Sequence, residues 1–349
     1  MVNWKVSFGL DFFKKMLQKK YIIIFLTVAV VTGGFVGWFA RNELSFLSKA
    51  SLPTATAQVR IDSPLYPLIN PLLYSESPMD TSSRYAKLLA SMKSFVDSAK
   101  ESGNADDVSV YFRDLNSATW IGVNENDTYT PASMLKVVVV MATLKLAESN
   151  PSILDEKLYY TATSTAGDHY PPNDDLKSGF YTVQDLVSYT VVYSDNAAVD
   201  ALLSDKNINN EFTSIYELFR LPISSSPNDF MSPKSFAVVF RTLYNSTLFQ
   251  WGLSEQVMDL LTKTTFNVGL VAELPNTLTV AHKFGESNDI LPNGSVEHEL
   301  HDCGIIYYPD DPYLLCVMTK GQDFDRLAGV IAGISKITYD FVEQQKSQI

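Results

Sequence analysis

The longest uncharged stretch of the chain lies near its N-terminus, at residues 21–40. Twenty helical residues rise about 30 Å, which is the thickness of the apolar core of a bilayer. The preceding residues 1–20 contain five lysines and one aspartate, a net charge of 5 − 1 = +4. Basic residues mark the cytoplasmic side of a membrane-spanning segment. The pattern predicts a single-pass anchor in the cell membrane, with a basic cytoplasmic N-terminus and an extracytoplasmic body.

A cleaved signal peptide is the alternative interpretation of residues 21–40. The stretch is longer than the apolar region of a usual signal peptide, and the nearest small-residue match, "ATAQ" at 55–58, is weak. Residues 41–80 are rich in Ser, Pro and Thr and keep no helical or strand period, which predicts an extracytoplasmic linker. Within it, "PLINPLL" is apolar enough to dock onto the folded domain.

Residues 81–345 show the periodic patterns of a folded domain. An amphipathic helix is predicted from "RYAKLLASMKSFVDSAKE", and two short strands from "VSVYFRDLNSATWIGVNEND". Residues 131–146 are apolar on nearly every face, which predicts a buried helix. The pattern over 150–260 is mostly helical. A strand at "TVAHKFGES", a hairpin turning at "PDDP" and a helix over 323–344 follow.

Strands at both ends of a domain, with helices between them, favour a single sheet. We therefore expect an α+β fold, in which an antiparallel β-sheet is flanked by N- and C-terminal helices and carries an inserted all-helical subdomain. The composition, 46% hydrophobic and 19% charged, is typical of a globular protein. The net charge of −12 argues against nucleic acid as a partner, because phosphate binding needs clustered Lys and Arg.

The chain has only two cysteines, Cys303 and Cys316, so no disulfide framework holds the fold together. They fall on the two strands of one predicted hairpin. A cross-strand disulfide is possible in an oxidising compartment. Since the strand register is not determined by the sequence, two buried thiols are an equal alternative.

Ser133 and Lys136 lie one turn apart in the predicted buried helix, and no other serine in the chain has a lysine three residues later. The pair is either a chance occurrence in a core helix or a nucleophile beside its base. A serine hydroxyl becomes a good nucleophile when a neighbouring base takes its proton. An apolar helix can supply that base, because desolvation lowers the pKa of an ammonium group.

Two further short motifs follow in the chain, Ser194-Asp195-Asn196 and Lys283-Phe284-Gly285. Each by itself is weak, since a sequence such as Ser-Asp-Asn also occurs as a helix cap. In this order, and with Ser194 61 positions after Ser133, the three motifs resemble the active-site triplet of class A β-lactamases and penicillin-binding proteins. The resemblance covers about residues 82–342 and implies a β-lactamase/transpeptidase-like fold for the domain 81–345.

The resemblance also implies roles. Ser133 would be the nucleophile and Lys136 its base, while Ser194 would pass a proton to the leaving nitrogen and Asn196 would hold the substrate amide. Substrate would bind along Lys283, Phe284, Gly285 and Glu286. There, Lys283 would attract the substrate carboxylate and lower the pKa of Lys136. Backbone N–H groups of Ser133 and Glu286 would stabilise the oxyanion. No cofactor is expected.

Two departures from the family pattern affect the expected chemistry. Phe284 stands where the family has a hydroxyl residue that helps to bind the substrate carboxylate. Class A β-lactamases also carry, after the second motif, a glutamate that activates water for deacylation. Between Glu217 and Glu255 this chain has only one acid, Asp229. We expect Asp229 to cap the helix that starts near Pro233 rather than to act as a base.

The "EHELH" stretch, with His298 and His301, hints at zinc, but helical zinc motifs of the HExxH type space their histidines by four. We assign no metal and expect a surface or hinge role for these histidines. The sequence thus predicts a membrane-anchored serine hydrolase that cleaves the β-lactam amide through an acyl-serine intermediate. The alternatives are a D-Ala-D-Ala carboxypeptidase or penicillin-binding protein, and a non-hydrolytic covalent sensor of β-lactams or peptidoglycan.

Overall fold

The computed structural model describes residues 59–60, 65–70, 72–74, 82–165, 168–172, 176–219, 221, 229–291 and 294–346. The predicted basic N-terminus and anchor, residues 1–20 and 21–40, lie outside these residues. In the part of the chain that is described, no helix is both long enough and apolar enough to span a bilayer.

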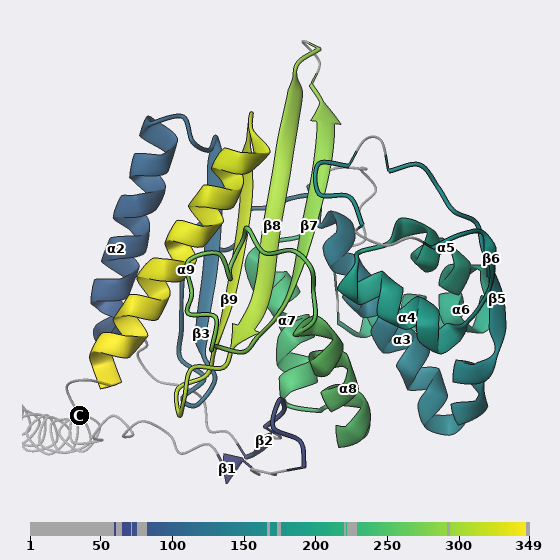
Figure 1. The fold of residues 1–349 in the computed structure, drawn as a ribbon. Helices are drawn as coiled ribbons and strands as arrows, with labels where there is room; N and C mark the ends of the chain where they lie inside the picture. Colours follow the sequence, from purple (N-terminus) through teal and green to yellow (C-terminus); the bar gives the residue numbers. More distant parts are fainter. Residues whose placement is uncertain are drawn as a thin grey trace, which may run out of the picture. The chain divides into compact units, whose positions relative to one another are not determined.

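A five-stranded antiparallel sheet forms the centre of the domain, in the order β4-β3-β9-β8-β7 (Figure 1). The strands are β3 (Asp107–Asp114), β4 (Trp120–Val123), β7 (Val280–Ile290), β8 (Val296–Ile306) and β9 (Tyr313–Gly321). The terminal helices α2 (Ser82–Glu101) and α9 (Phe324–Lys346) lie side by side on one face. The expected α+β sheet with flanking terminal helices is therefore confirmed.

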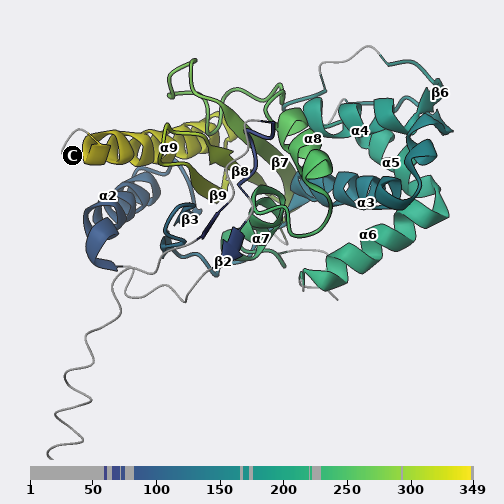
Figure 2. The same cartoon turned by 90° about the horizontal axis from the view of Figure 1, so that it is seen from below.

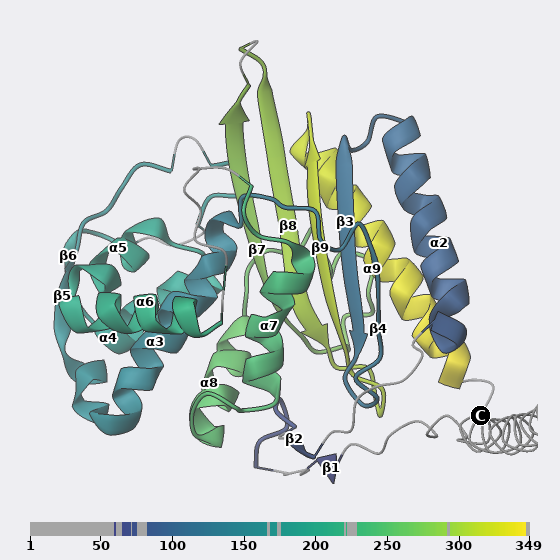
Figure 3. The ribbon, with the colours of Figure 1, turned by 180° about the vertical axis from the view of Figure 1, so that it is seen from behind.

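The other face of the sheet is covered by α7 (Pro233–Tyr244), and α8 (Trp251–Leu261) packs beside it against β7 (Figure 3). Seen from below, the sheet lies between these two layers of helices, and the inserted subdomain extends beyond the β7 edge (Figure 2). Because helices cover both faces, the central strand β9 is buried at every position.

The inserted subdomain consists mainly of helices: α3 (Lys136–Ser149), α4 (Val183–Val192), α5 (Asn196–Ser204) and α6 (Lys206–Leu218). It also contains an antiparallel pair of strands, β5 (Lys157–Tyr160) and β6 (Gly179–Thr182), so the expectation of an all-helical subdomain was wrong. The signal for these strands was present, because "KLYY" and "GFYT" are rich in aromatic residues that favour a pleated, half-buried surface.

Helix α3 is the buried helix that the sequence predicts, and ten of its fourteen residues are buried. Four consecutive valines, Val137 to Val140, have below-average helix propensity because their branched side chains lose χ1 freedom. The helix is therefore stabilised by its packing against α4, α5, α6 and α8 rather than by local preference.

The "PLINPLL" stretch docks onto the domain, as expected. Ile69 is buried, and the backbone N–H of Leu68 donates to Glu255 Oε2 at 3.0 Å. The N–H of Asn70 donates to the carbonyl of Tyr244 at 2.8 Å. Its last two residues begin the short strand β2 (Leu72–Tyr74), which pairs with β1 (Val59–Arg60).

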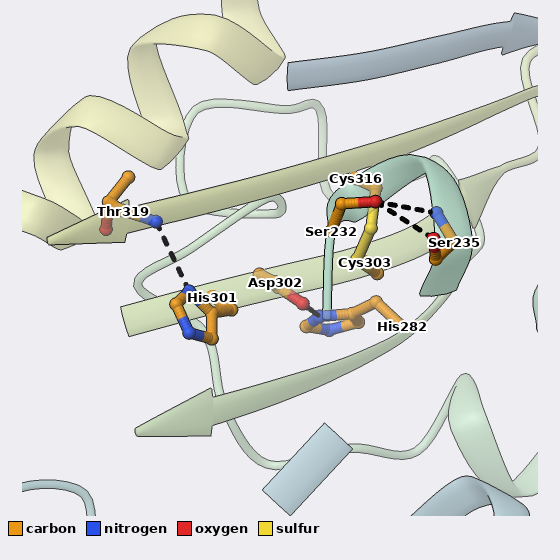
Figure 4. The surroundings of a disulfide bond; sticks show 8 residues. All are labelled: Ser232, Ser235, His282, His301, Asp302, Cys303, Cys316 and Thr319. Carbon is orange, nitrogen blue, oxygen red and sulfur yellow. Dashed lines mark hydrogen bonds and ion pairs between the residues drawn. A yellow bond between two sulfur atoms is a disulfide. The ribbon is translucent and has the colours of Figure 1, made fainter. Parts of the chain in front are cut away.

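Cys303 and Cys316 are directly opposite each other on β8 and β9 and form a disulfide (Figure 4). Both are fully buried. The register of the β8–β9 pair thus decides between the two alternatives that the sequence left open.

Candidate active site

Ser133 lies in a short 3-10 helix, Ala132–Leu135, and Lys136 is the first residue of α3. The Nζ atom of Lys136 is 2.9 Å from the Oγ atom of Ser133. Ala132, immediately before the nucleophile, has φ = 47°, in the left-handed region that is unfavourable for a residue with a Cβ. Such strain persists where the surrounding structure enforces it and is common at active sites.

Three other oxygen atoms surround the Lys136 amine. The carbonyl oxygen of Ser194 accepts from it, Asn196 Oδ1 accepts at 2.7 Å, and Ser194 Oγ lies at 3.3 Å. A carbonyl oxygen can only accept, so Ser194 O and Asn196 Oδ1 use two N–H bonds of the amine. In neutral lysine the remaining position is a lone pair, and it faces the hydroxyl of Ser133. The geometry therefore suits transfer of the Ser133 proton to Lys136.

The surroundings of the two lysines shift both of them toward their neutral forms. Burial lowers the pKa of Lys136 to about 8, although the negative charge of Asp195 opposes the shift. Lys283 is fully buried, and burial together with the charge of Lys136 lowers its pKa well below the usual value. The expected effect of Lys283 on the pKa of Lys136 is not seen, because burial accounts for that shift; the charge of Lys136 instead lowers the pKa of Lys283.

Ser194 connects the two lysines. Its Oγ atom is 2.8 Å from Lys283 Nζ, and its backbone has φ = 61°. This conformation is held from the next residue, because Asp195 caps α5 through the N–H of Ala198 at 2.9 Å and accepts from the hydroxyl of Tyr160 at 2.8 Å. The middle residue of the Ser-Asp-Asn motif is therefore the structural cap, while Ser194 and Asn196 face Lys136.

Gly285 lets strand β7 lie directly against the turn that carries the nucleophile. A Cβ atom at this position would come within 2.7 Å of the carbonyl oxygen of Pro131 and 3.1 Å of the backbone nitrogen of Met134. Any larger residue would push the strand away from the turn. Glu286, the next residue of β7, lines the cavity that forms beside Ser133.

The resulting cavity has a volume of about 230 Å³. It is lined by Ser133, Ser194, Asn196, Phe284 and Glu286, together with Asp168, Tyr170 and other residues of the 168–172 loop and the nucleophile turn. The Glu286 carboxylate accepts from the backbone N–H groups of His169 at 3.0 Å and Tyr170 at 3.2 Å, so it ties this loop to β7. Burial, with a contribution from Asp168, raises the pKa of Glu286.

His301 corrects the expectation of a surface or hinge role, because it is fully buried beneath the nucleophile turn. The N–H of Thr319 donates to its Nδ1 atom at 3.2 Å (Figure 4), so the proton of the neutral ring is on Nε2. Nε2 lies 3.0 Å from the carbonyl oxygen of Thr130 and 3.1 Å from Glu299 Oε2. Glu299 Oε2 in turn accepts from the N–H of Thr130 at 2.9 Å.

Glu299 and His301 thus hold both peptide groups of Thr130, three residues before Ser133. Sequence reasoning missed this role, although the signal was the spacing of the two residues. In a strand, positions two apart lie on one face, and "EHELH" was weighed against helical spacing only. His298, the other histidine of this stretch, is half-buried and contacts Asn288 Oδ1 at 2.6 Å.

Asp229 also differs from the expectation. The helix begins at Pro233 as predicted, but its cap is Ser232, whose hydroxyl accepts from the N–H of Ser235 at 3.2 Å (Figure 4). Asp229 instead forms an ion pair with Lys320. Lys320 also lies 3.1 Å from the fully buried Glu299, so its ammonium group supplies positive charge to these carboxylates.

The geometry defines a class of protein: a serine nucleophile beside a buried lysine of lowered pKa, with a second serine linking that lysine to another. This is the arrangement of a serine acyl-transfer enzyme. Residues 91–342 match the model of the beta-lactamase enzyme family, and since this is most of the chain, the protein belongs to that family. It is a serine hydrolase of the β-lactamase type.

Solved structures agree at the level of the fold. A class A β-lactamase from Bacteroides cellulosilyticus is 19% identical with a TM-score of 0.61, over 74% of this chain and 99% of its own. A β-lactamase from Chitinophaga pinensis is 20% identical with a TM-score of 0.60, over 72% and 98%. PBP-A is 18% identical with a TM-score of 0.59, over 74% and 96%.

Proposed function

We propose that this protein is a membrane-anchored hydrolase that opens the β-lactam amide bond through an acyl-Ser133 intermediate. The observation that carries the proposal is the environment of Lys136. Its amine is 2.9 Å from the Ser133 hydroxyl, while two carbonyl oxygens occupy its other hydrogen-bonding positions. Only a neutral amine in this setting can accept a proton from the nucleophile.

The acylation step follows from these contacts. Lys136 takes the proton of Ser133 as Oγ bonds to the carbonyl carbon of the substrate. Ser194 donates its proton to the departing nitrogen as the amide bond breaks. Lys136, which then carries the proton of Ser133 and lies 3.3 Å from Ser194 Oγ, restores the proton of Ser194. Water then hydrolyses the ester and releases Ser133.

The second candidate is an enzyme that is acylated rapidly and deacylated slowly: a D-Ala-D-Ala carboxypeptidase or penicillin-binding protein, or a covalent sensor. The ion pair of Asp229 with Lys320 favours it, because this pairing engages the one acid between Glu217 and Glu255. A variant of PBP-A, 18% identical to this chain with a TM-score of 0.59, has been solved as an acyl-enzyme complex with penicillin G.

A chromogenic cephalosporin and a fluorescent penicillin separate the candidates. We expect both to acylate the protein with one label per chain, located on Ser133 by peptide mass spectrometry. Continued colour release after the first turnover supports β-lactam hydrolysis. A single stoichiometric burst with a stable label, together with release of D-Ala from a D-Ala-D-Ala peptide, supports the carboxypeptidase. Absence of both colour release and a label on Ser133 contradicts both candidates.

The membrane anchor is part of the proposal and rests on residues 1–40 of the sequence. We expect the full-length protein to remain in the membrane fraction after washing at alkaline pH, and protease added to intact cells to reach the domain from outside. A variant that starts at Ala55 should appear in the soluble fraction. Recovery of the full-length protein from the soluble fraction would contradict anchoring.

A further inference from the structure

A second cavity adjoins the catalytic pocket and also has a volume of about 230 Å³. The two cavities share a wall, because Tyr170 and Phe284 line both. We call the second cavity the aromatic subsite and define it by Tyr170, Tyr193, Phe266, Val268 and Phe284. None of the described residues that line it is an Asp, Glu, Lys or Arg.

The walls of the aromatic subsite are held in place by ring contacts. Phe284 stacks on Phe266 with ring centroids 4.1 Å apart and planes 13° apart. The ring of Tyr170 meets both edge-on, at 5.0 Å from Phe266 and 6.2 Å from Phe284. The hydroxyl of Tyr170 is buried and has no hydrogen-bond partner among the described residues. At the rim, Val268 is 37% exposed.

The aromatic subsite lies on the side of the catalytic cavity where the leaving group of the substrate is expected. Ser194 is the proton donor to the departing nitrogen, so the group attached to that nitrogen lies on the side of Ser194 and Lys283. Lys283 Nζ is 2.8 Å from Ser194 Oγ and 4.2 Å from the centre of the Phe284 ring. Phe284 lines both cavities, so a substituent that extends from the departing nitrogen along the Phe284 side of the catalytic cavity enters the adjoining one.

We infer that the aromatic subsite binds an uncharged aromatic ring carried by the leaving group of the substrate. This inference rests on the proposed function and specifies its substrate class. Stacked and edge-on rings offer another ring both face and edge contacts, and the described lining residues, none of which is an Asp, Glu, Lys or Arg, favour a neutral group.

Two cephalosporins with the same acylamino side chain test this inference, one with an arylvinyl group and the other with a methyl group on the six-membered ring. Each second-order rate constant for acylation of the full-length protein in detergent is divided by the rate constant for alkaline hydrolysis of the same compound, which removes the difference in chemical reactivity. We expect the corrected constant to be about tenfold or more higher for the arylvinyl compound, since burial of apolar groups discriminates to this extent.

Val268→Asp places a carboxylate at the rim without disturbing the core, and we expect it to lower the arylvinyl-to-methyl ratio at least about fivefold. The matched control is Val296→Asp, because Val296 is 41% exposed at the end of the β7–β8 hairpin and outside both cavities. It should leave the ratio unchanged. Equal corrected constants, or an unchanged ratio in Val268→Asp, would overturn the subsite alone. No acylation by either compound would overturn the proposed function and the subsite with it.

Discussion

Replacing Lys136 with alanine is expected to slow acylation of Ser133 by about 10²- to 10⁴-fold, the usual contribution of a positioned general base. The reason is that no other amine approaches Ser133 Oγ as closely among the described contacts, whereas Lys136 Nζ lies 2.9 Å away. The measurement is the second-order rate constant for labelling by a fluorescent penicillin, followed on a gel or by mass spectrometry.

The rate constant for acylation is also expected to depend on pH through the ionisation of Lys136. Protonated Lys136 cannot accept a proton, so acylation should rise about tenfold per pH unit below the pKa, which is about 8, and level off above it. In Lys136→Ala the residual labelling should lack this ionisation. A lysine replaced elsewhere on the surface, Lys157→Ala, serves as the control and should behave as the parent protein.

Labelling by Lys136→Ala within a few fold of the parent, or a flat profile of the parent between pH 6 and 9, would exclude Lys136 as the base. The thermal unfolding temperature of Lys136→Ala must be measured as well. Removal of the Lys136 amine leaves Ser194 O and Asn196 Oδ1 without their hydrogen-bond donor. A folded variant with slow labelling separates the chemical role from a structural one.

Replacing Glu299 with alanine is expected to lower the free energy of unfolding by about 3–5 kcal/mol, as for other buried ion pairs that lose one partner. Glu299 is fully buried, and three groups depend on its carboxylate: the N–H of Thr130, the ring of His301 and the ammonium of Lys320. Removal leaves the N–H of Thr130 without an acceptor and leaves Lys320 with less compensating charge. Urea unfolding of the fragment that starts at Ala55 measures the loss.

Glu297→Ala provides the matched control for Glu299→Ala. Glu297 lies two residues earlier on the same strand, but its side chain is 20% exposed and its carboxylate is 3.9 Å from Lys320. Its removal should cost no more than about 1 kcal/mol. If the two variants unfold at the same urea concentration, Glu299 does not hold the nucleophile turn in the way inferred from its contacts.

The catalytic groups could be found from the sequence because each depends on short-range chemistry. Ser133 and Lys136 are three residues apart, and one helical turn brings them to the same side whatever surrounds them. Ser194 and Asn196 flank a helix cap, which is again a local feature. The order of the motifs then related these groups to one another through a family resemblance, and the matching family model supports that step.

The sheet and its terminal helices could be predicted for a similar reason. The strand-favouring residues of β3, the alternation along β4, the turn at "PDDP" and the helical period of α9 are all local patterns. The two-stranded β5–β6 pair was not predicted, although its aromatic residues favour strands, because both strands lie within residues 150–260, where the pattern is mostly helical.

By itself, then, the sequence indicated the proposed nucleophile, its proposed base and the α+β architecture, since these follow from spacing within a few residues. The tertiary structure decided which distant groups meet them: Lys283 at Ser194, Glu299 and His301 at Thr130, and Phe284 at Phe266. Strand register is the physical reason. A shift of one residue turns every side chain of a strand to the opposite face, and the pairing that excludes such a shift is made by residues far away in the chain.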